Sequence, residues 1–171
     1  VGDDQRDPDR YTLYIGQSGL GLGDRQMYLE EKFAPQRERY QQYVAQMLQL
    51  AGWDKPVEHA AAIVAMEKRI AEAHWTRAES RDRDKTYNVV SFAELKARYP
   101  GYDWDAQLRG QGMPVPERLN IPTPDAVQPV IDVINATPLA TWRDYLAFHA
   151  IDGNAGFLSR EIDDASFAFN G

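Results

Sequence analysis

Apolar residues recur at helical spacing through most of this chain, and this pattern is the strongest limit on its fold. The clearest example follows Pro56, where one apolar stripe consists of Ile63, Met66, Ile70 and Ala73. The opposite side of the same segment carries Glu67, Lys68, Arg69 and Glu72. Because an α-helix repeats about every 3.6 residues, the arrangement predicts an amphipathic helix over residues 56–73 with a charged outer face.

Four further segments show the same period. Residues 35–51 carry the stripe Tyr40, Val44, Met47 and Ala51, and Gly52 follows where a left-handed helix cap is favoured. Residues 125–135 resume helical spacing, although Pro129 inside them predicts a later start. Thr137-Pro138 caps a helix with the stripe Leu139, Trp142, Leu146 and His149. A last helix begins near Ser159 and carries Ile162, Ala165 and Phe169.

Local signals mark two shorter helices and a strand in the middle of the chain. Ser91 and Glu94 form a capping box, which predicts the start of a helix that Pro100 and Gly101 end. Residues 103–110 add one or two further turns. Prolines interrupt the following segment, within which residues 118–121 are expected to be extended.

The N-terminal region predicts one short strand. Tyr11, Leu13 and Ile15 alternate with Thr12 and Tyr14 in the period-2 pattern of a half-buried strand. Glycines at positions 16, 19, 21 and 23 follow and permit positive φ in a loop that leads to the first helix. These elements predict a mainly α fold, a multi-helix orthogonal bundle with a short N-terminal β strand or hairpin.

Composition limits the class of protein. A chain of 171 residues with 43% hydrophobic content suits a single domain over residues 1–171. The longest apolar stretch, Ala60 to Met66, is far shorter than the roughly 20 residues of a membrane helix. The net charge of -7 and the scattered basic residues predict that no nucleic acid binds. The absence of cysteine excludes disulfides and thiolate chemistry but leaves the cellular compartment open.

The three histidines do not match a metal site. A zinc peptidase motif needs two histidines at i and i+4 on one helical face, with a glutamate between them. His59 and His74 lie about four helical turns apart, and His149 stands alone. We expect His59 and His149 to be hydrogen-bonded residues of the core or its boundary. The sequence therefore assigns no catalytic and no metal-binding residue, and it leaves the substrate-binding residues unknown.

Two other candidate sites have simpler structural explanations. The glycine-rich loop lacks the lysine and hydroxyl of a phosphate-binding loop and does not match the dinucleotide fingerprint, so we interpret it as a tight turn. The carboxylate pairs Asp103 with Asp105 and Asp163 with Asp164 fit helix starts or a solvated face better than a general acid and base.

Aromatic and basic side chains are the remaining candidates for recognition. Four tryptophans could line a peptide groove, although packing in the core is the interpretation we favour for most of them. They are Trp53, Trp75, Trp104 and Trp142. Three arginines could bind carboxylates, although a solvated face of alternating charge accounts for them better. They are Arg77, Arg81 and Arg83.

Three signatures occur in a fixed order along nearly the whole chain. The first is Gly19-Leu20-Gly21-Leu22 followed by Asp24-Arg25 and Tyr28, with Gly23 at a position where proline is usual. The second runs from His74-Trp75-Thr76-Arg77 through Lys85-Thr86-Tyr87-Asn88 and Leu95 to Tyr102-Asp103-Trp104. The third extends from Trp142 to the aromatic-rich end, Phe167 to Gly171. This ordered set resembles the neprilysin and endothelin-converting-enzyme family of zinc metallopeptidases.

The resemblance implies that residues 1–171 are part of the non-catalytic N-terminal helical domain of such an enzyme. In the family, this domain closes over a thermolysin-like domain that holds the zinc, and the two enclose a chamber that admits peptides and excludes folded proteins. The parent is then a zinc metalloendopeptidase whose zinc is bound outside this segment, and the segment alone is inactive. Its implied partners are the catalytic domain of the same parent chain and peptide substrates. No catalytic residue of the family can be placed on this sequence.

Several expectations concern the origin of the chain. It begins at Val1 without a methionine or a leader, so we expect it to be a fragment of a larger helical domain. Animal members of the family are disulfide-bonded ectodomains, so the absence of cysteine predicts a bacterial, extracytoplasmic member. Helices separated from their domain expose apolar patches, which predicts self-association. The alternative of a free-standing helical protein–protein interaction module without catalysis remains open.

Overall fold

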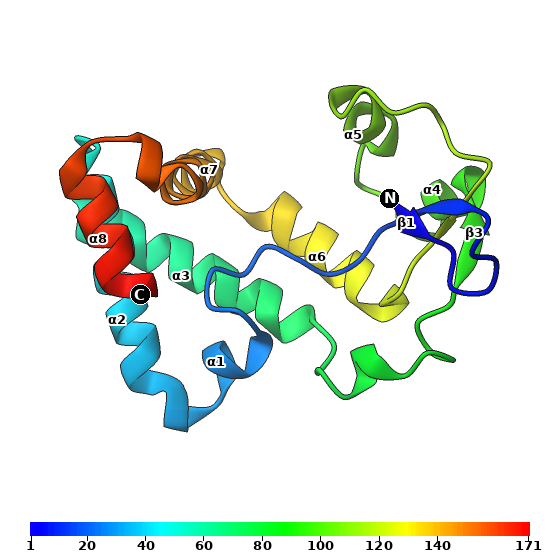
Figure 1. Cartoon of the computed structure of the whole chain (residues 1–171), viewed down its shortest axis with the longest axis horizontal. Helices are drawn as coiled ribbons and strands as arrows, with labels where there is room; N and C mark the ends of the chain where they lie inside the picture. The colour runs from blue at the N-terminus through cyan, green and yellow to red at the C-terminus, as the bar shows by residue number, and fades with distance from the viewer. The chain divides into compact units, whose positions relative to one another are not determined.

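The protein has a mainly α fold with a small sheet. The computed structural model describes all residues from Val1 to Gly171 and contains eight α-helices and four strands. β1 (Gly2–Asp3) and β2 (Tyr11–Tyr14) form an antiparallel pair at the N-terminus, drawn in dark blue in Figure 1. The predicted fold class, mainly α with a short N-terminal strand or hairpin, is therefore confirmed. None of the helices is long and apolar enough to cross a lipid bilayer.

Contacts between residues divide the chain into two compact units. The sheet unit comprises Val1–Ser18 and Ala73–Asn135, and the helical unit comprises Gly19–Glu72 and Ala136–Gly171. Each unit is built from two separate stretches of sequence and contains its own cluster of buried apolar residues. The single domain expected over residues 1–171 stays a prediction, because compact packing does not show whether a unit folds alone.

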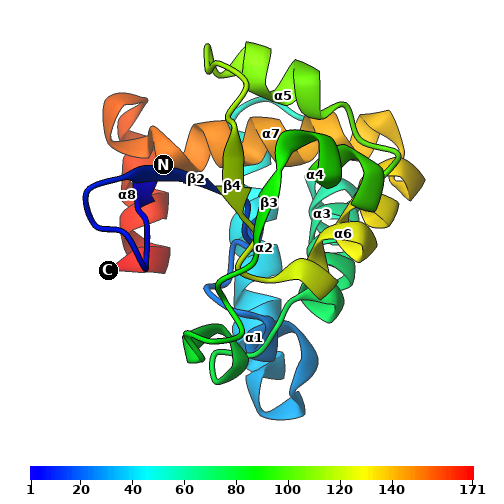
Figure 2. The same ribbon diagram turned by 90° about the vertical axis from the view of Figure 1, so that its right-hand side faces the viewer.

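The strands of the sheet unit form one sheet with the order β1-β2-β4-β3. β3 (Val89–Ser91) pairs antiparallel with β4 (Arg118–Asn120). β2 pairs parallel with β4, which places Leu13 opposite Leu119. Figure 2 shows β4 between β2 and β3. The extended conformation predicted for residues 118–121 is confirmed, and it brings a strand from the middle of the chain beside the N-terminal one.

The alternation predicted for the first strand is wrong at two positions. Tyr11 is 80% exposed, whereas Thr12 is only 4% exposed. Thr12 is buried because its hydroxyl donates a hydrogen bond of 3.1 Å to the buried carboxylate of Asp4. A polar partner of this kind does not show in an apolar/polar alternation, so the alternation assigned these two side chains to the wrong faces.

Three helices complete the sheet unit. They are α4 (Phe92–Arg98), α5 (Trp104–Gly110) and α6 (Pro124–Ala136), with a short 3-10 helix, η2 (Glu79–Arg81). The predicted capping box is confirmed, since the Ser91 hydroxyl accepts from the Glu94 amide and the Glu94 carboxylate accepts from the Ser91 amide. The apolar core of the unit includes Phe92, Leu95 and Leu119, so it joins α4 to the sheet.

α6 starts earlier than predicted. It begins at Pro124 and continues through Pro129. A proline at the first helical position removes only an N–H that would have had no helical partner. Pro129 does remove one helical hydrogen bond, and a proline inside a helix costs about 3 kcal/mol. Val127 and Ile131, on either side of it, are buried in the core. Burial contributes about 1.5–3 kcal/mol for each such side chain, so packing maintains the helix.

The helical unit contains five α-helices and two 3-10 helices. They are α1 (Arg25–Leu29), η1 (Glu31–Phe33), α2 (Ala34–Leu50), α3 (Pro56–Ala73), α7 (Leu139–Gly153), η3 (Ala155–Phe157) and α8 (Arg160–Asn170). The helices predicted over residues 35–51 and 56–73 are confirmed as α2 and α3. Gly52 has a φ of 88°, as expected for a left-handed cap after α2. α8 follows Ser159, as predicted.

The core of the helical unit is rich in aromatic side chains. Tyr40 and Tyr43 of α2 each pack edge-on against Phe148 of α7, with ring centroids 6.0 Å apart in both pairs. Tyr43 also stacks on Phe169 of α8, with centroids 4.3 Å apart and the rings nearly parallel. Aromatic pairs of this kind add about 0.5–1.5 kcal/mol beyond the burial of their area. These contacts join α2 to the two C-terminal helices.

The apolar stripe predicted for α7 is wrong. Leu139 is 76% exposed and Leu146 is 61% exposed, whereas Phe148 is buried. α7 carries apolar residues around most of its circumference, so its pattern does not mark one face, and packing against α2 decides which side is buried. The residue at the N-cap of α7 is Pro138, not Thr137, and it provides no side-chain hydrogen bond to the helix.

Candidate functional site

The histidines of the helical unit are held by buried carboxylates. His149 Nε2 on α7 lies 3.0 Å from Glu67 Oε1 on α3. His59 Nδ1 on α3 lies 2.5 Å from Asp144 Oδ2 on α7. The prediction that His59 and His149 are hydrogen-bonded residues of the core or its boundary is therefore confirmed. His74, just after α3, is 7% exposed.

These residues do not fit a zinc site. Zinc in proteins takes three or four nitrogen, oxygen or sulfur ligands that converge at about 2 Å. No group of three histidine, aspartate or glutamate side chains in this chain has that geometry. His59 and His149 each contact a single carboxylate, that of Asp144 and that of Glu67 respectively.

Glu67 is the polar centre of the helical unit. The sequence places it on the charged outer face of its helix, and this expectation is wrong, because Glu67 is 0% exposed. Its carboxylate accepts hydrogen bonds from the Tyr28 hydroxyl (2.7 Å) and the Tyr40 hydroxyl (3.1 Å), and it faces His149. One side chain thus connects α1, α2, α3 and α7. Its position three residues before buried Ile70 is the sequence signal that could have indicated its burial.

The glycine-rich loop is held in place by Tyr28. The Tyr28 hydroxyl accepts hydrogen bonds from the amides of Gly21 (3.1 Å) and Leu22 (2.9 Å) while it donates to Glu67. All three hydrogen-bonding positions of the hydroxyl are therefore used. A Cβ on Gly21 would lie only 1.9 Å from the Tyr40 hydroxyl oxygen, so no larger residue fits. The loop bends at residues 21–24, and the amides of Gly21 and Leu22 bind a side chain of the protein.

Burial determines the protonation of the tyrosines around Glu67. It raises the pKa of Tyr28 and of Tyr40 far above the ordinary value, and the negative charge of Glu67 raises both further. The pKa of Tyr145 rises to about 12 for the same two reasons. The three phenols stay protonated at any physiological pH, so Tyr28 and Tyr40 remain permanent donors to the carboxylate. This arrangement suits a structural role.

Asp144 and Asp152 on α7 make similar links. Asp144 accepts a hydrogen bond of 2.9 Å from the indole nitrogen of Trp53, in addition to its contact with His59. The hydroxyl of Tyr43 donates to the carboxylate of Asp152. Burial, followed by this hydrogen bond, raises the pKa of Tyr43 to about 12. Both carboxylates therefore attach α7 to its neighbours.

Asp4 is the corresponding centre of the sheet unit. Its buried carboxylate accepts hydrogen bonds from the Arg6 amide (3.0 Å) and from the side chains of Thr12 (3.1 Å), Tyr87 (3.0 Å) and Arg118 (3.0 Å). The hydrogen bond from the Arg6 amide, together with the three side-chain donors, lowers the pKa of Asp4 to about 2 despite its burial. Sequence analysis missed Asp4, because it lies in a polar, turn-forming run that gives no sign of burial.

The carboxylate pairs named from the sequence lie at helix starts and on the surface. Asp103 caps α5, since its carboxylate accepts from the amide of the third helical residue at 2.8 Å. Asp105 forms an exposed ion pair with Lys96 at 2.9 Å. Asp163 and Asp164 are exposed in the first turns of α8. The interpretation as helix starts or a solvated face is confirmed.

The tryptophans and arginines also occupy separate places. Trp104 is 7% exposed and donates its indole N–H to the Tyr99 carbonyl at 3.0 Å, so it belongs to the core of the sheet unit. The other three tryptophans are half-buried. Arg77, Arg81 and Arg83 are all exposed, near or within η2. Trp75, Trp104 and the three arginines belong to the sheet unit, whereas Trp53 and Trp142 belong to the helical unit.

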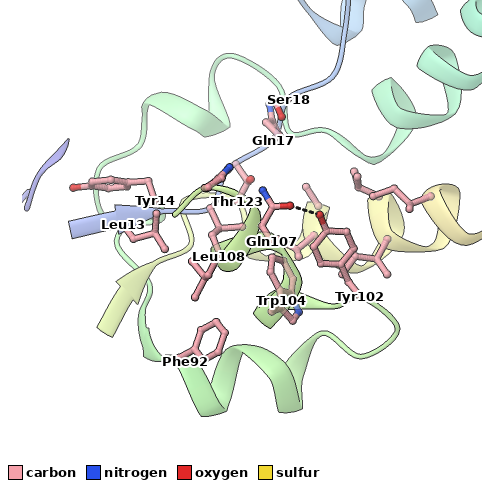
Figure 3. A pocket seen from close by; sticks show the side chains of 18 of the residues that line it. Leu13, Tyr14, Gln17, Ser18, Phe92, Tyr102, Trp104, Gln107, Leu108 and Thr123 are labelled. Atoms are coloured by element: carbon pink, nitrogen blue, oxygen red, sulfur yellow. Dashed lines mark hydrogen bonds between the residues drawn. The ribbon is translucent and has the colours of Figure 1, made fainter. Parts of the chain in front are cut away.

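The sheet unit contains a pocket of about 280 Å³, hereafter the α5–α6 pocket. Its walls come from β2 and the loop that follows it, from α5 and from α6. Figure 3 shows side chains that line it, including Trp104 and Leu108 of α5 and Thr123 just before α6. At its margin the Tyr102 hydroxyl donates a 2.5 Å hydrogen bond to Gln107 Oε1, drawn as a dashed line in Figure 3. Sequence analysis did not identify this pocket, because its residues come from distant segments.

The fold occurs in solved structures of peptidases. The zinc metalloprotease Zmp1 of Mycobacterium tuberculosis in an open state superposes with a TM-score of 0.89 and 28% identity, over 95% of this chain and 26% of that chain. Zmp1 in complex with an inhibitor gives a TM-score of 0.86. PepO from Lactobacillus rhamnosis HN001 shares the fold with a TM-score of 0.82 at 19% identity, over 99% of this chain and 28% of that chain. The fold is thus that of one segment of a large peptidase.

Sequence comparison leads to the same class of protein. Endothelin-converting enzyme-like 1 of Mus musculus is 26% identical over 169 residues, which are 95% of this chain and 22% of the relative. Endothelin-converting enzyme 1 of Cavia porcellus is 26% identical over 180 residues, covering 99% of this chain and 24% of the relative. The sequence profile of Peptidase family M13 matches residues 1–171, so the chain belongs to that family, in its N-terminal domain. It spans about a quarter of the length of these relatives.

Proposed function

We propose that this chain is part of the substrate-restricting helical domain of a zinc metalloendopeptidase. In this proposal it helps to enclose the chamber in which the parent hydrolyses peptides, and it is inactive by itself. The match of the family profile to all 171 residues carries the proposal. The similarity to Zmp1, a zinc metalloprotease, supports zinc-dependent peptide hydrolysis by the parent.

The zinc ligands and the general base are then provided by another segment of the parent. The pairing of His59 with Asp144 and of His149 with Glu67 supports this assignment, because each pair is part of the packing between helices. The catalytic domain of the same parent chain is the proposed partner, and peptides are the proposed substrates. We further propose a bacterial parent that works outside the cytoplasm.

Self-association of the isolated chain is also part of the proposal. Several large apolar side chains of the helical unit are exposed, and Phe157 (92%), Leu139 and Phe167 (76% each) are the most exposed. Exposed apolar groups of this size favour association when they form a continuous patch. Sedimentation velocity at several concentrations is the measurement for this point. A chain that stays monomeric at every concentration would speak against it.

The main proposal is tested by comparing the purified 171-residue chain with the intact parent. An internally quenched peptide is incubated with each, with and without a chelator, and bound zinc is measured after dialysis. We expect the parent to hydrolyse the peptide in a chelator-sensitive manner and to retain zinc, and the chain to do neither. Hydrolysis or zinc retention by the chain alone would contradict its assignment as a non-catalytic segment. A parent with no His-Glu-x-x-His sequence and no activity would contradict the assignment as a peptidase.

A further inference from the structure

The α5–α6 pocket is lined by uncharged residues only. None of the side chains that line it is an aspartate, glutamate, lysine, arginine or histidine, although 26% of the chain is charged. A charged ligand in this pocket would lose its hydration without gaining a partner of opposite charge. The pocket therefore selects for an uncharged group.

The size and the walls of the pocket suit a ring. Tyr102 and Trp104 provide aromatic surface and pack edge-to-face with their centroids 4.8 Å apart. Val127, Val130 and Ile131 of α6 add branched aliphatic surface. An apolar cavity of about 150 Å³ is large enough to bind benzene. The volume here, about 280 Å³, therefore accommodates one substituted ring.

One buried polar atom in the wall has no partner. Thr123 is 3% exposed, and its hydroxyl oxygen makes no hydrogen bond. The Thr123 hydroxyl does not cap α6. The amide of Ala126, in the first turn of that helix, donates to the Thr123 backbone carbonyl (3.1 Å) and not to the hydroxyl. A buried hydroxyl without a partner costs about 1–3 kcal/mol. A ligand that brings a hydrogen-bonding atom to this point removes that cost.

Three glutamines line the pocket, Gln17, Gln107 and Gln111, and their side chains differ in the hydrogen bonds that they can offer. Gln17 is fully used, because its amide both donates to the Trp75 carbonyl (3.1 Å) and accepts from the Trp75 amide (2.7 Å). Gln107 is exposed and accepts from Tyr102, while its amide N–H groups remain directed to no residue of the chain. The pocket thus presents one orphan hydroxyl inside and the exposed amides of Gln107 and Gln111 in its lining.

We propose that the α5–α6 pocket binds an uncharged aromatic ring that carries one hydrogen-bonding substituent, with the substituent at the Thr123 hydroxyl. A phenol is the simplest group of this class. It reaches the pocket either as a free small molecule or as the side chain of a peptide. This proposal does not depend on the peptidase activity proposed above, because the pocket lies wholly within the sheet unit.

The test is a titration of the ¹⁵N-labelled 171-residue chain with p-cresol, toluene and phenylacetate, followed by NMR. We expect p-cresol to shift the amides around Thr123, Trp104 and Val127, toluene to bind more weakly, and phenylacetate to cause no such shifts. Thr123→Val removes the hydroxyl at nearly constant volume. One neutral hydrogen bond contributes about 0.5–1.5 kcal/mol, so the ratio of the p-cresol affinity to the toluene affinity should fall about 2- to 13-fold in this variant. An unchanged preference, or binding of phenylacetate as tight as that of p-cresol, overturns the proposal.

Two further arms test the location and the source of the ligand. Val130→Phe fills the pocket from a half-buried position and should abolish the p-cresol shifts. Val115→Phe adds the same ring at a residue 62% exposed, outside the pocket, and should leave them unchanged. Persistence of the shifts in folded Val130→Phe refutes the assignment to this pocket. Binding of N-acetyltyrosinamide as well as p-cresol identifies a peptide side chain as the source, and binding of p-cresol alone identifies a free small molecule.

Discussion

The buried carboxylate of Glu67 provides the sharpest test of how the helical unit is held together. Glu67→Ala removes the acceptor of the Tyr28 and Tyr40 hydroxyls and the partner of His149. Each buried donor left without an acceptor costs about 1–3 kcal/mol, and loss of one member of a buried ionic network costs about 3–5 kcal/mol. Because His149 can reach water, we expect the variant to lose about 3–5 kcal/mol of unfolding free energy.

The glutamine variant distinguishes hydrogen bonding from charge. In Glu67→Gln the amide oxygen can still accept from Tyr28, which has no free lone pair, and the amide nitrogen can donate to Tyr40. We therefore expect a loss of only about 1–2 kcal/mol, roughly one altered hydrogen bond.

Urea unfolding followed by circular dichroism measures both losses. Glu72→Ala on the same helix is the matched control, since Glu72 is exposed, and it should change the unfolding free energy by less than about 0.5 kcal/mol. A loss below about 1 kcal/mol in Glu67→Ala would refute the view that this carboxylate joins the four helices.

Three further predictions follow from individual contacts. Gly21→Ala should lower the free energy of unfolding, measured by thermal unfolding, by about 1–3 kcal/mol, because the new Cβ would lie 1.9 Å from the Tyr40 hydroxyl oxygen. Gly110→Ala is the control and should be neutral, because a Cβ at that position would have no atom within 4 Å. Asp4 has its pKa lowered from 3.8 to about 2, so its contribution is complete above pH 3.8 and is lost as the pH falls toward 2. Asp4→Asn should therefore flatten the pH dependence of urea unfolding in that window, and an unchanged slope would contradict the shift. Ser91→Ala should lower the free energy of unfolding by about 1 kcal/mol, because it removes the side-chain cap of α4, and unchanged urea unfolding would refute this prediction.

Signals that act within a few residues made the helix boundaries predictable. Pro56 at the start of α3, Gly52 after α2 and the Ser91–Glu94 capping box all act through their own backbone neighbours. All the residues that take part in such a signal are adjacent in the sequence, so the helix boundary can be predicted without knowledge of the fold. The order of signatures along the chain likewise sufficed to recognise the family before any geometry was known.

The interior of each unit was less predictable, because distant partners decide it. In the sequence, Glu67 and Asp4 resemble surface residues. They are buried because residues distant in the sequence donate hydrogen bonds to them, Tyr40 to Glu67 and Arg118 to Asp4. The exposed side of α7 is another such case, since apolar residues surround that helix and only its neighbours select Phe148. The α5–α6 pocket requires segments more than a hundred residues apart and leaves no local pattern.

The interleaving of the two units determines the order in which they can be completed during synthesis. The sheet unit has all its residues once Asn135 has left the ribosome. The helical unit, which begins at Gly19, must wait for the last 36 residues of the 171, from Ala136 to Gly171. Until then Glu67 has no His149 beside it, and Trp53 and His59 have no Asp144. The sheet unit is therefore the first to start and the first to be finished, and α1, α2 and α3 wait for α7 and α8 while residues 74–135 are synthesised.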